Sequence, residues 1–242
     1  MDNPDLAAIW VYLSASPLLA LTLTLVAYNI AHRLYVYSRH HPLLNPVVTS
    51  VAALIGFLLL TDTSYDTYFA GGQFIHFLLG PATVALAIPL YQQVSKLKKL
   101  WLPIMLALMT GVTINALSVV WIARFLGASV QTQISLAPKS VTAPVAMGIS
   151  KQIGGLPTLT AAVVVLTGIL GATLGPKLLH VMRIQDDSVK GIAIGVSAHG
   201  LGTARSFQVS AEMGAFSGLA MALSALASAL VIPWLLSKGG IL

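Results

Sequence analysis

Long apolar windows alternate with short polar connections along the whole chain. Each window holds about 19 to 25 residues, enough to cross a hydrocarbon core of roughly 30 Å as an α-helix. The pattern predicts an all-α polytopic membrane protein. The expected spans are Leu6 to Ile30, Pro42 to Leu60, Tyr68 to Tyr91, Leu102 to Phe125, Leu156 to Leu179, Gly191 to Ser210 and Ala215 to Leu236.

One further window, Leu136 to Gln152, carries a lysine, two prolines and several hydroxyl residues in the sequence LAPKSVTAPVAMGISKQ. Proline has no N–H and interrupts regular helix hydrogen bonding, so backbone groups are freed at this point. We therefore expect an interrupted segment, which either crosses the membrane or dips in and returns. The chain then has about seven to eight membrane segments.

The charged connections suggest how the chain threads. The basic loops around Arg33 and Arg39 and around Lys96 to Lys99 are expected to be cytoplasmic, and the acidic TDTSYD loop and the amino terminus are expected outside. A full crossing at Leu136 to Gln152 leaves the basic loop from Lys177 to Lys190 outside. A returning segment makes that loop, and Lys238 at the carboxyl end, cytoplasmic, and we favour this alternative.

Composition narrows the class of protein. The chain is 57% hydrophobic and 8% charged, with a mean hydropathy of +0.87, so we predict a single integral-membrane domain over residues 1–242. The net charge of +6 is spread beside the ends of apolar segments, which indicates orientation and not a nucleic-acid surface. No basic region or cleavage site precedes the first window, so it is expected to remain as an anchor.

An internal repeat is suggested at an offset of 57 residues. Pro81 and Thr83 align with Pro138 and Ser140, which defines pseudo-repeats of about 42–126 and 131–236. Under the favoured threading the two repeats have opposite orientation. Two interrupted segments in inverted repeats indicate a transporter-like fold, with a binding site near the bilayer midplane.

The interrupted window supplies the first candidate binding site. Pro138, Lys139, Ser140 and Thr142 combine a cation, two hydroxyls and an opened helix end. This combination suits a small organic anion, because a helix amino terminus also presents free N–H groups. The alternative is that Lys139 extends to the membrane interface and the prolines only bend a helix.

The second candidate is the stretch SAHGLGTARSF, which contains His199, Gly200, Gly202, Thr203 and Arg205. An arginine at membrane depth needs a partner, either a ligand carboxylate or Glu212, seven residues on. His199 suits proton coupling, or it is a buried imidazole bonded to a neighbouring hydroxyl. Secondary candidates are Pro81, Thr83, Asn115 and Glu212. No metal-ligand cluster, cofactor motif or catalytic triad accompanies them, so we do not expect an enzyme.

A family resemblance follows from LGPATVALAIPLY, LAPKSVTAPVAMGISKQIGG, SAHGLGTARSF and EMGAFSGLAMAL. These motifs resemble the LrgB/CidB family of bacterial inner-membrane proteins, which includes YohK-like proteins. The resemblance implies an inner-membrane location and a small LrgA/CidA-type membrane partner. It also implies either holin-like or antiholin-like control of murein hydrolase activity and lysis, or transport of small carboxylates such as glycolate, glycerate or pyruvate.

Between these functions the polar residues favour a secondary transporter of small monocarboxylates, because a lesion-forming helix does not need costly charges at membrane depth. The alternative is an antiholin-like or holin-like regulator of lysis that moves no solute. We also expect a homo-oligomer. The coupling ion, H⁺ or Na⁺, is left open.

Overall fold

The computed structural model describes residues 17–38, 44–85 and 87–238, and these parts contain helices, turns and no strand. The chain forms two compact units, Met1–Ala85 and Leu86–Leu242, which are described separately. The first predicted span, Leu6 to Ile30, lies partly outside the described residues. The predicted single domain over residues 1–242 stays a prediction.

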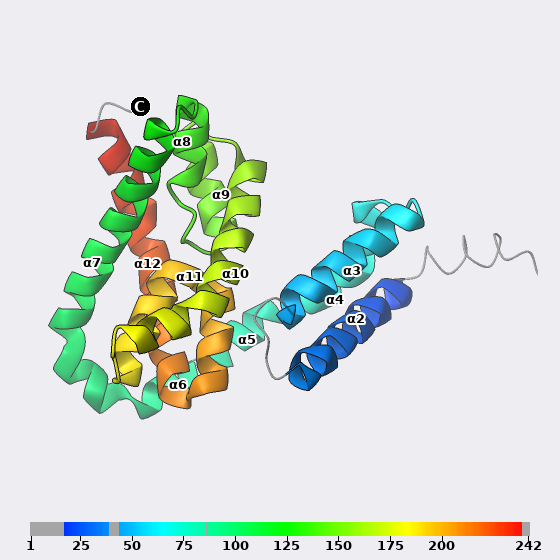
Figure 1. Cartoon of the computed structure of the whole chain (residues 1–242), viewed down its shortest axis with the longest axis horizontal. Helices are drawn as coiled ribbons and strands as arrows, with labels where there is room; N and C mark the ends of the chain where they lie inside the picture. Colours follow the sequence, from blue (N-terminus) through cyan, green and yellow to red (C-terminus); the bar gives the residue numbers. More distant parts are fainter. Residues whose placement is uncertain (1–16, 39–43, 86, 239–242) are drawn as a thin grey trace, which may run out of the picture. The chain divides into compact units, whose positions relative to one another are not determined.

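The first unit is a small helical assembly. Helix α2 (Pro17–Tyr37) packs against α3 (Pro46–Leu60) and α4 (Tyr65–Phe77), and the short α5 (Leu79–Ala85) follows α4 (Figure 1). The hydroxyls of Thr24 and Tyr68 lie 2.7 Å apart and join α2 to α4. Asn45 begins α3 by accepting a hydrogen bond from the Val47 N–H.

The predicted span Tyr68 to Tyr91 is divided into separate helices. It comprises most of α4, then α5, then α6 (Ala87–Gln92), which belongs to the second unit. Pro81 is the third residue of α5, where a missing backbone N–H costs no helix hydrogen bond. The sequence was therefore right that regular helix is interrupted here.

Three long helices form the frame of the second unit: α7 (Val94–Phe125), α10 (Pro157–Val181) and α12 (Ala211–Lys238) (Figure 1). At 1.5 Å per residue they measure about 48, 38 and 42 Å, more than the roughly 30 Å core of a bilayer. Together with α2, these are the described helices that are long and apolar enough to span a membrane. The chain is thus a multi-pass membrane protein.

The polar window lies between α7 and α10 and turns back on itself. Helices α8 (Val130–Leu136) and α9 (Ala143–Gln152) are joined by a turn at residues 137–142. The Thr160 hydroxyl at the start of α10 lies 2.8 Å from the Ser135 carbonyl oxygen and 2.7 Å from the Ser150 hydroxyl. The end of α9 therefore returns to α8, and the two helices form a hairpin with residues 137–142 at its tip.

Helix α11 (Asp187–Val209) forms a second hairpin. A straight helix of this length would separate its ends by about 34 Å, yet the Ser210 hydroxyl donates a 2.7 Å hydrogen bond to the Asp187 carboxylate. The turn is at His199, whose φ of 39° and ψ of −135° break the helix. The prediction that Gly191 to Ser210 crosses as one helix is therefore wrong.

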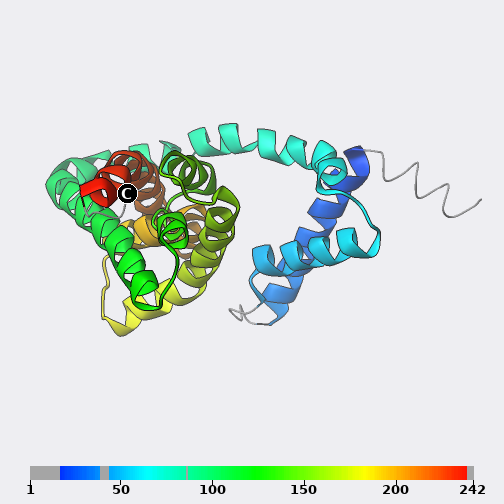
Figure 2. The ribbon, with the colours of Figure 1, turned by 90° about the horizontal axis from the view of Figure 1, so that it is seen from above.

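The two hairpins open at opposite ends of α10. The α8–α9 hairpin is tied to Thr160 near the start of α10, whereas Asp187 follows the end of α10 by six residues. Helix α12 packs against α7, α9 and α11, so it lies beside both hairpins (Figure 2). This arrangement brings the two hairpin tips into the middle of the unit.

Because α11 turns back, the end of α12 lies on a different side of the unit from the one that the sequence predicted. Lys96 at the start of α7 contacts Glu212 at the start of α12, while Leu236 near the end of α12 belongs to a buried cluster with Val120 near the end of α7. Lys238 therefore lies at the opposite end of the unit from the α10–α11 loop. The prediction that both lie on one side is wrong, because it counted α11 as a full crossing.

Candidate functional site

A small cavity of about 10 Å³ lies where the two hairpins meet. The first hairpin contributes its tip, and α11 contributes Val196, one turn before its own tip. Helices α7 and α12 close the remaining sides. The polar lining residues are Asn115, Ser140, Ser224 and Ser228. We call this cavity the tip site.

Lys139 lies at the edge of the tip site. Its ammonium group donates a 3.2 Å hydrogen bond to the Ser140 hydroxyl, which lines the cavity. Within the described residues no carboxylate lies within ion-pairing distance of this lysine. A half-buried cation without a counter-charge favours an anion brought in from outside the protein.

The turn that presents Lys139 is well packed. Pro138 is fully buried, and Ser140 is 7% exposed. Thr142 is the N-cap residue of α9, but its side chain caps no backbone N–H, and Pro144 follows within the first turn. The opened helix end that the sequence predicts is therefore present beside Lys139 and Ser140.

Two lining groups have free hydrogen-bonding capacity. Among the described residues, the Asn115 amide and the Ser228 hydroxyl form no side-chain hydrogen bond. The sequence placed Asn115 only among the secondary candidates, and it missed the serines of α12. The spacing of these serines could have identified them. Ser217, Ser224 and Ser228 are seven and four residues apart, so they share one face of the helix.

His199 holds the tip of the second hairpin. Its Nε2 atom lies 2.9 Å from the Val164 carbonyl oxygen of α10, and the residue is buried. The predicted alternative to proton coupling was a bond to a neighbouring hydroxyl, but the ring contacts a backbone carbonyl instead. Proton coupling stays a prediction. A positive φ is costly for a residue with a side chain, so the bond helps to maintain the turn.

Gly202 and Thr203 serve packing after His199, whereas Gly200 has open space around it. A Cβ on Gly202 would lie 2.6 Å from Ile194 of the other arm, whereas a Cβ on Gly200 would meet only the Met221 sulfur at 3.9 Å. The buried Thr203 hydroxyl lies 2.9 Å from the Ser217 hydroxyl of α12. None of these three residues lines the tip site.

The structure separates Arg205 and Glu212. Arg205 lies on the returning arm of α11 and donates a 2.8 Å hydrogen bond to Gln208, and it does not line the tip site. Glu212 instead accepts from Lys96 at 2.6 Å. The alternative that Arg205 pairs with Glu212 is therefore wrong, because the helix ends at Ser210 and the spacing of seven residues does not hold.

The remaining secondary candidates lie in the first unit. Pro81 is exposed on α5, and Thr83 belongs to the same helix. Their predicted relation to the site on the second unit stays a prediction. Among the described residues no group of three or more His, Asp or Glu side chains is placed to hold a metal ion.

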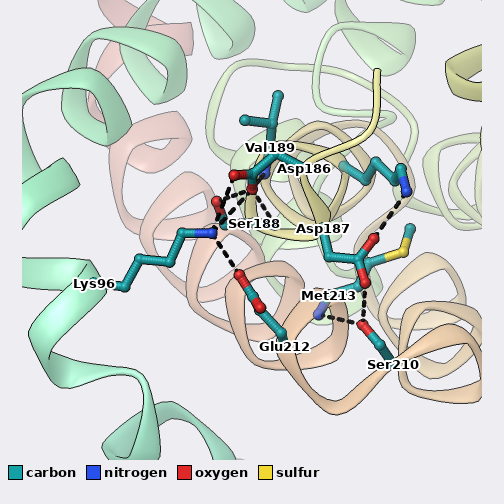
Figure 3. A network of polar contacts seen from close by, with 9 residues as sticks. Lys96, Asp186, Asp187, Ser188, Val189, Ser210, Glu212 and Met213 are labelled. Atoms are coloured by element: carbon teal, nitrogen blue, oxygen red, sulfur yellow. Dashed lines mark hydrogen bonds and ion pairs between the residues drawn. The ribbon is translucent and has the colours of Figure 1, made fainter. Parts of the chain in front are cut away.

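An ionic network ties the base of the second hairpin to both neighbouring helices (Figure 3). The Lys96 ammonium lies 3.1 Å from each Asp186 oxygen and 2.6 Å from Glu212. Lys190 and Ser210 bind Asp187 from the two arms of the hairpin. By contrast, the first hairpin is closed by the buried hydroxyls of Ser135, Ser150 and Thr160.

The network has a predicted pH dependence. Hydrogen bonds from the Ser188 hydroxyl and then from Lys96 lower the pKa of Asp186 to about 2. A carboxylate with a lowered pKa stabilises the fold above its unfolded pKa of about 3.9, and this is lost as the pH falls toward 2. Asp186→Asn should therefore lower the melting temperature at pH 7, and the difference from the parent should shrink between about pH 4 and pH 2.

Thermal unfolding in detergent across this pH range measures the difference. Asp66→Asn in the first unit is the control for removal of one carboxylate, since Asp66 forms no ion pair among the described residues. A melting temperature of Asp186→Asn equal to the parent's at pH 7 contradicts the prediction.

The chain is similar in sequence to a known protein family. A sequence model described as the LrgB-like family matches residues 24–237, nearly the whole chain. The chain belongs to the LrgB-like family. The match covers both hairpins, α7, α10 and nearly all of α12, so the tip site lies within the shared region. No solved structure matches the chain.

Similar curated proteins are of matching length. The chain is 38% identical to "Uncharacterized protein YwbG" of Bacillus subtilis, covering 91% of this chain and 97% of that protein. It is 35% identical to "Holin-like protein CidB" of Staphylococcus epidermidis, over 93% and 97%. It is 32% identical to "Antiholin-like protein LrgB" of Bacillus cereus, over 90% and 95%. The resemblance noted in the sequence is therefore confirmed for this LrgB-like protein.

Proposed function

We propose that this LrgB-like protein is a secondary transporter of small monocarboxylates, of the glycolate, glycerate or pyruvate type, in the bacterial inner membrane. The observation that carries the proposal is Lys139, a half-buried cation without a carboxylate partner that is held beside a polar cavity between two hairpin tips. Interrupted segments that meet near the midplane are typical of transporter binding sites.

The ligand chemistry follows from the donors around the cavity. The Lys139 ammonium supplies positive charge, and the Asn115 amide and Ser228 hydroxyl are available to a carboxylate or to a neighbouring hydroxyl or keto oxygen. The cavity of about 10 Å³ has room for about one water molecule, so the proposal requires the hairpin tips to move apart when an acid binds. His199, beside the second tip, is the candidate for coupling transport to protons.

The threading is part of the proposal. The lysines at the start of α7 favour a cytoplasmic location for that end, which sends the α8–α9 hairpin in from the outside and the α11 hairpin in from the cytoplasm. The carboxyl terminus is then outside. Two hairpins of opposite direction support an inverted arrangement, while the repeat of residues 42–126 and 131–236 stays a prediction.

A second function is supported by the relatives. Proteins printed as holin-like CidB and antiholin-like LrgB cover nearly the whole chain, and these names support control of lysis more directly than they support transport. In this alternative the protein acts through an LrgA/CidA-like membrane partner or through a homo-oligomer, and the tip site moves no solute.

Purified protein in sealed liposomes separates the two functions. A transporter takes up labelled glycolate, glycerate or pyruvate with saturation, and unlabelled acid competes, while a trapped dye is retained. A holin-like protein releases the dye without saturation, and an antiholin-like protein does neither. Absence of saturable uptake for all three acids, with and without an LrgA-like partner and an imposed proton or sodium gradient, would reject the transport proposal.

A further inference from the structure

A large apolar groove runs along the second unit between α7 and the first arm of α11. Its volume is about 540 Å³, and it is distinct from the tip site, although Asn115 and Val196 border both. On α7 the groove extends from Leu100 to Asn115. We call it the α7–α11 groove.

The groove is suited to an apolar occupant. Its hydroxyl groups are already bonded within the chain: Ser197 to the Ala193 carbonyl at 2.6 Å, Thr110 to the Leu106 carbonyl, and Ser188 to Asp186. The rest of its lining is mainly aliphatic. A polar ligand would find few free donors or acceptors along most of its length.

The groove is long enough to hold a lipid chain that enters from one membrane face. Leu100 and Ile114 are fourteen residues apart on one helix, or about 21 Å, compared with roughly 15 Å for one leaflet of the hydrocarbon core. One end is near the ionic network, and the other is near the middle of α7. An acyl chain anchored at the first end would therefore lie within the groove over its whole depth in the leaflet.

Positive charge lies at the membrane-face end of the groove. Lys99 precedes Pro103, Ala107 and Ile114 by four, eight and fifteen residues, so helical spacing places it on the face of α7 that lines the groove. Lys98 and Lys99 are exposed, and neither forms an ion pair among the described residues. Lys96, by contrast, is already paired.

We propose that the α7–α11 groove binds an anionic phospholipid, with one acyl chain between α7 and α11 and the phosphate headgroup at Lys98 and Lys99. Basic side chains at the cytoplasmic surface attract anionic headgroups. Because the hydroxyls of the groove are bonded within the protein, its lining is available to an acyl chain. The proposal does not depend on transport of a carboxylate.

Tryptophan quenching by brominated lipids tests the occupant in the full-length protein. The four native tryptophans are replaced by phenylalanine, and one tryptophan is introduced by Ile114→Trp, at an exposed position that lines the groove. The reporter is compared in nanodiscs that contain phosphatidylglycerol or phosphatidylcholine brominated in the middle of the acyl chain. Ile122→Trp, an exposed position on the same helix outside the groove, is the matched control.

At the Ile114→Trp reporter, the association constant of phosphatidylglycerol is expected to exceed that of phosphatidylcholine by at least about fivefold. One surface lysine contributes about this factor. The control reporter shows equal quenching by both lipids. Lys98→Gln with Lys99→Gln abolishes the preference, whereas the double arginine variant retains it and Arg124→Gln at the other end of α7 has no effect.

Two outcomes would overturn the proposal. Equal quenching by both lipids at the groove means that any lipid fills it without recognition of charge. Absence of quenching at the groove, with normal quenching at the control, means that protein covers it. If the protein shows no saturable uptake of the acids but binds phosphatidylglycerol selectively, the transport proposal is rejected and the lipid proposal is retained.

Discussion

Lys139→Ala is expected to abolish saturable carboxylate uptake while leaving the protein folded. The ammonium has only the Ser140 hydroxyl as a side-chain partner, so its removal breaks no ion pair within the described residues. The bound acid, by contrast, would lose its counter-charge in a site removed from bulk water. Loss of one partner of a buried charge pair costs about 2 to 5 kcal/mol, which lowers affinity by roughly 30-fold or more.

The measurement combines initial uptake rates in liposomes with binding of the acid in detergent and with the melting temperature. Lys151→Ala is the matched control, because Lys151 is an exposed lysine at the base of the same hairpin. Lys139→Arg should keep part of the uptake, since it preserves charge but not shape. If Lys139→Ala transports as well as the parent, the tip site does not bind the substrate anion.

The first hairpin was predictable because its chemistry departs from its surroundings. Pro138, Lys139 and Pro144 interrupt an otherwise apolar pattern, and each disfavours a straight helix in lipid for its own physical reason. The structure adds the hydroxyl bonds from Ser135 and Ser150 to Thr160 that close the hairpin. Those bonds join residues up to 25 positions apart, which no local pattern indicates.

The second hairpin was missed because its turn has no proline. Gly200 and Gly202 beside His199 were assigned to a candidate binding stretch within a segment that was predicted to cross as one helix. The turn instead depends on a left-handed backbone at His199 and on a bond from its ring to Val164 of another helix. Tertiary contacts of this kind are not visible in hydropathy.

The prediction that α11 is one continuous helix also led to wrong predictions for residues near it. Arg205 and Glu212 share a face only on a continuous helix, and the end of α11 at Ser210 separates them. The same error placed Lys238 with the basic loop. Asn115 was identified but ranked low, because its importance arises from the two hairpin tips that meet beside it.

Gly195→Ala is expected to destabilise the second unit strongly. Gly195 lies on the first arm of α11, where a Cβ would be 2.3 Å from the Ser217 carbonyl oxygen and 2.9 Å from the Ala220 side chain of α12. A backbone carbonyl cannot move aside as a flexible side chain can. The added methyl must therefore push the hairpin away from α12, and overpacking of this kind costs about 1 to 3 kcal/mol.

Thermal unfolding in detergent, followed by size-exclusion chromatography, measures this effect. Gly148→Ala is the matched control, because Gly148 is also helical but a Cβ there would meet no atom within 4 Å. That control should keep or slightly raise the melting temperature, since alanine favours helix over glycine. Gly195→Ala should also weaken uptake, because the adjacent Val196 lines the tip site. Equal melting temperatures for the two variants would contradict the close packing of α11 against α12, and with it the fold-back at His199 that brings the two tips together.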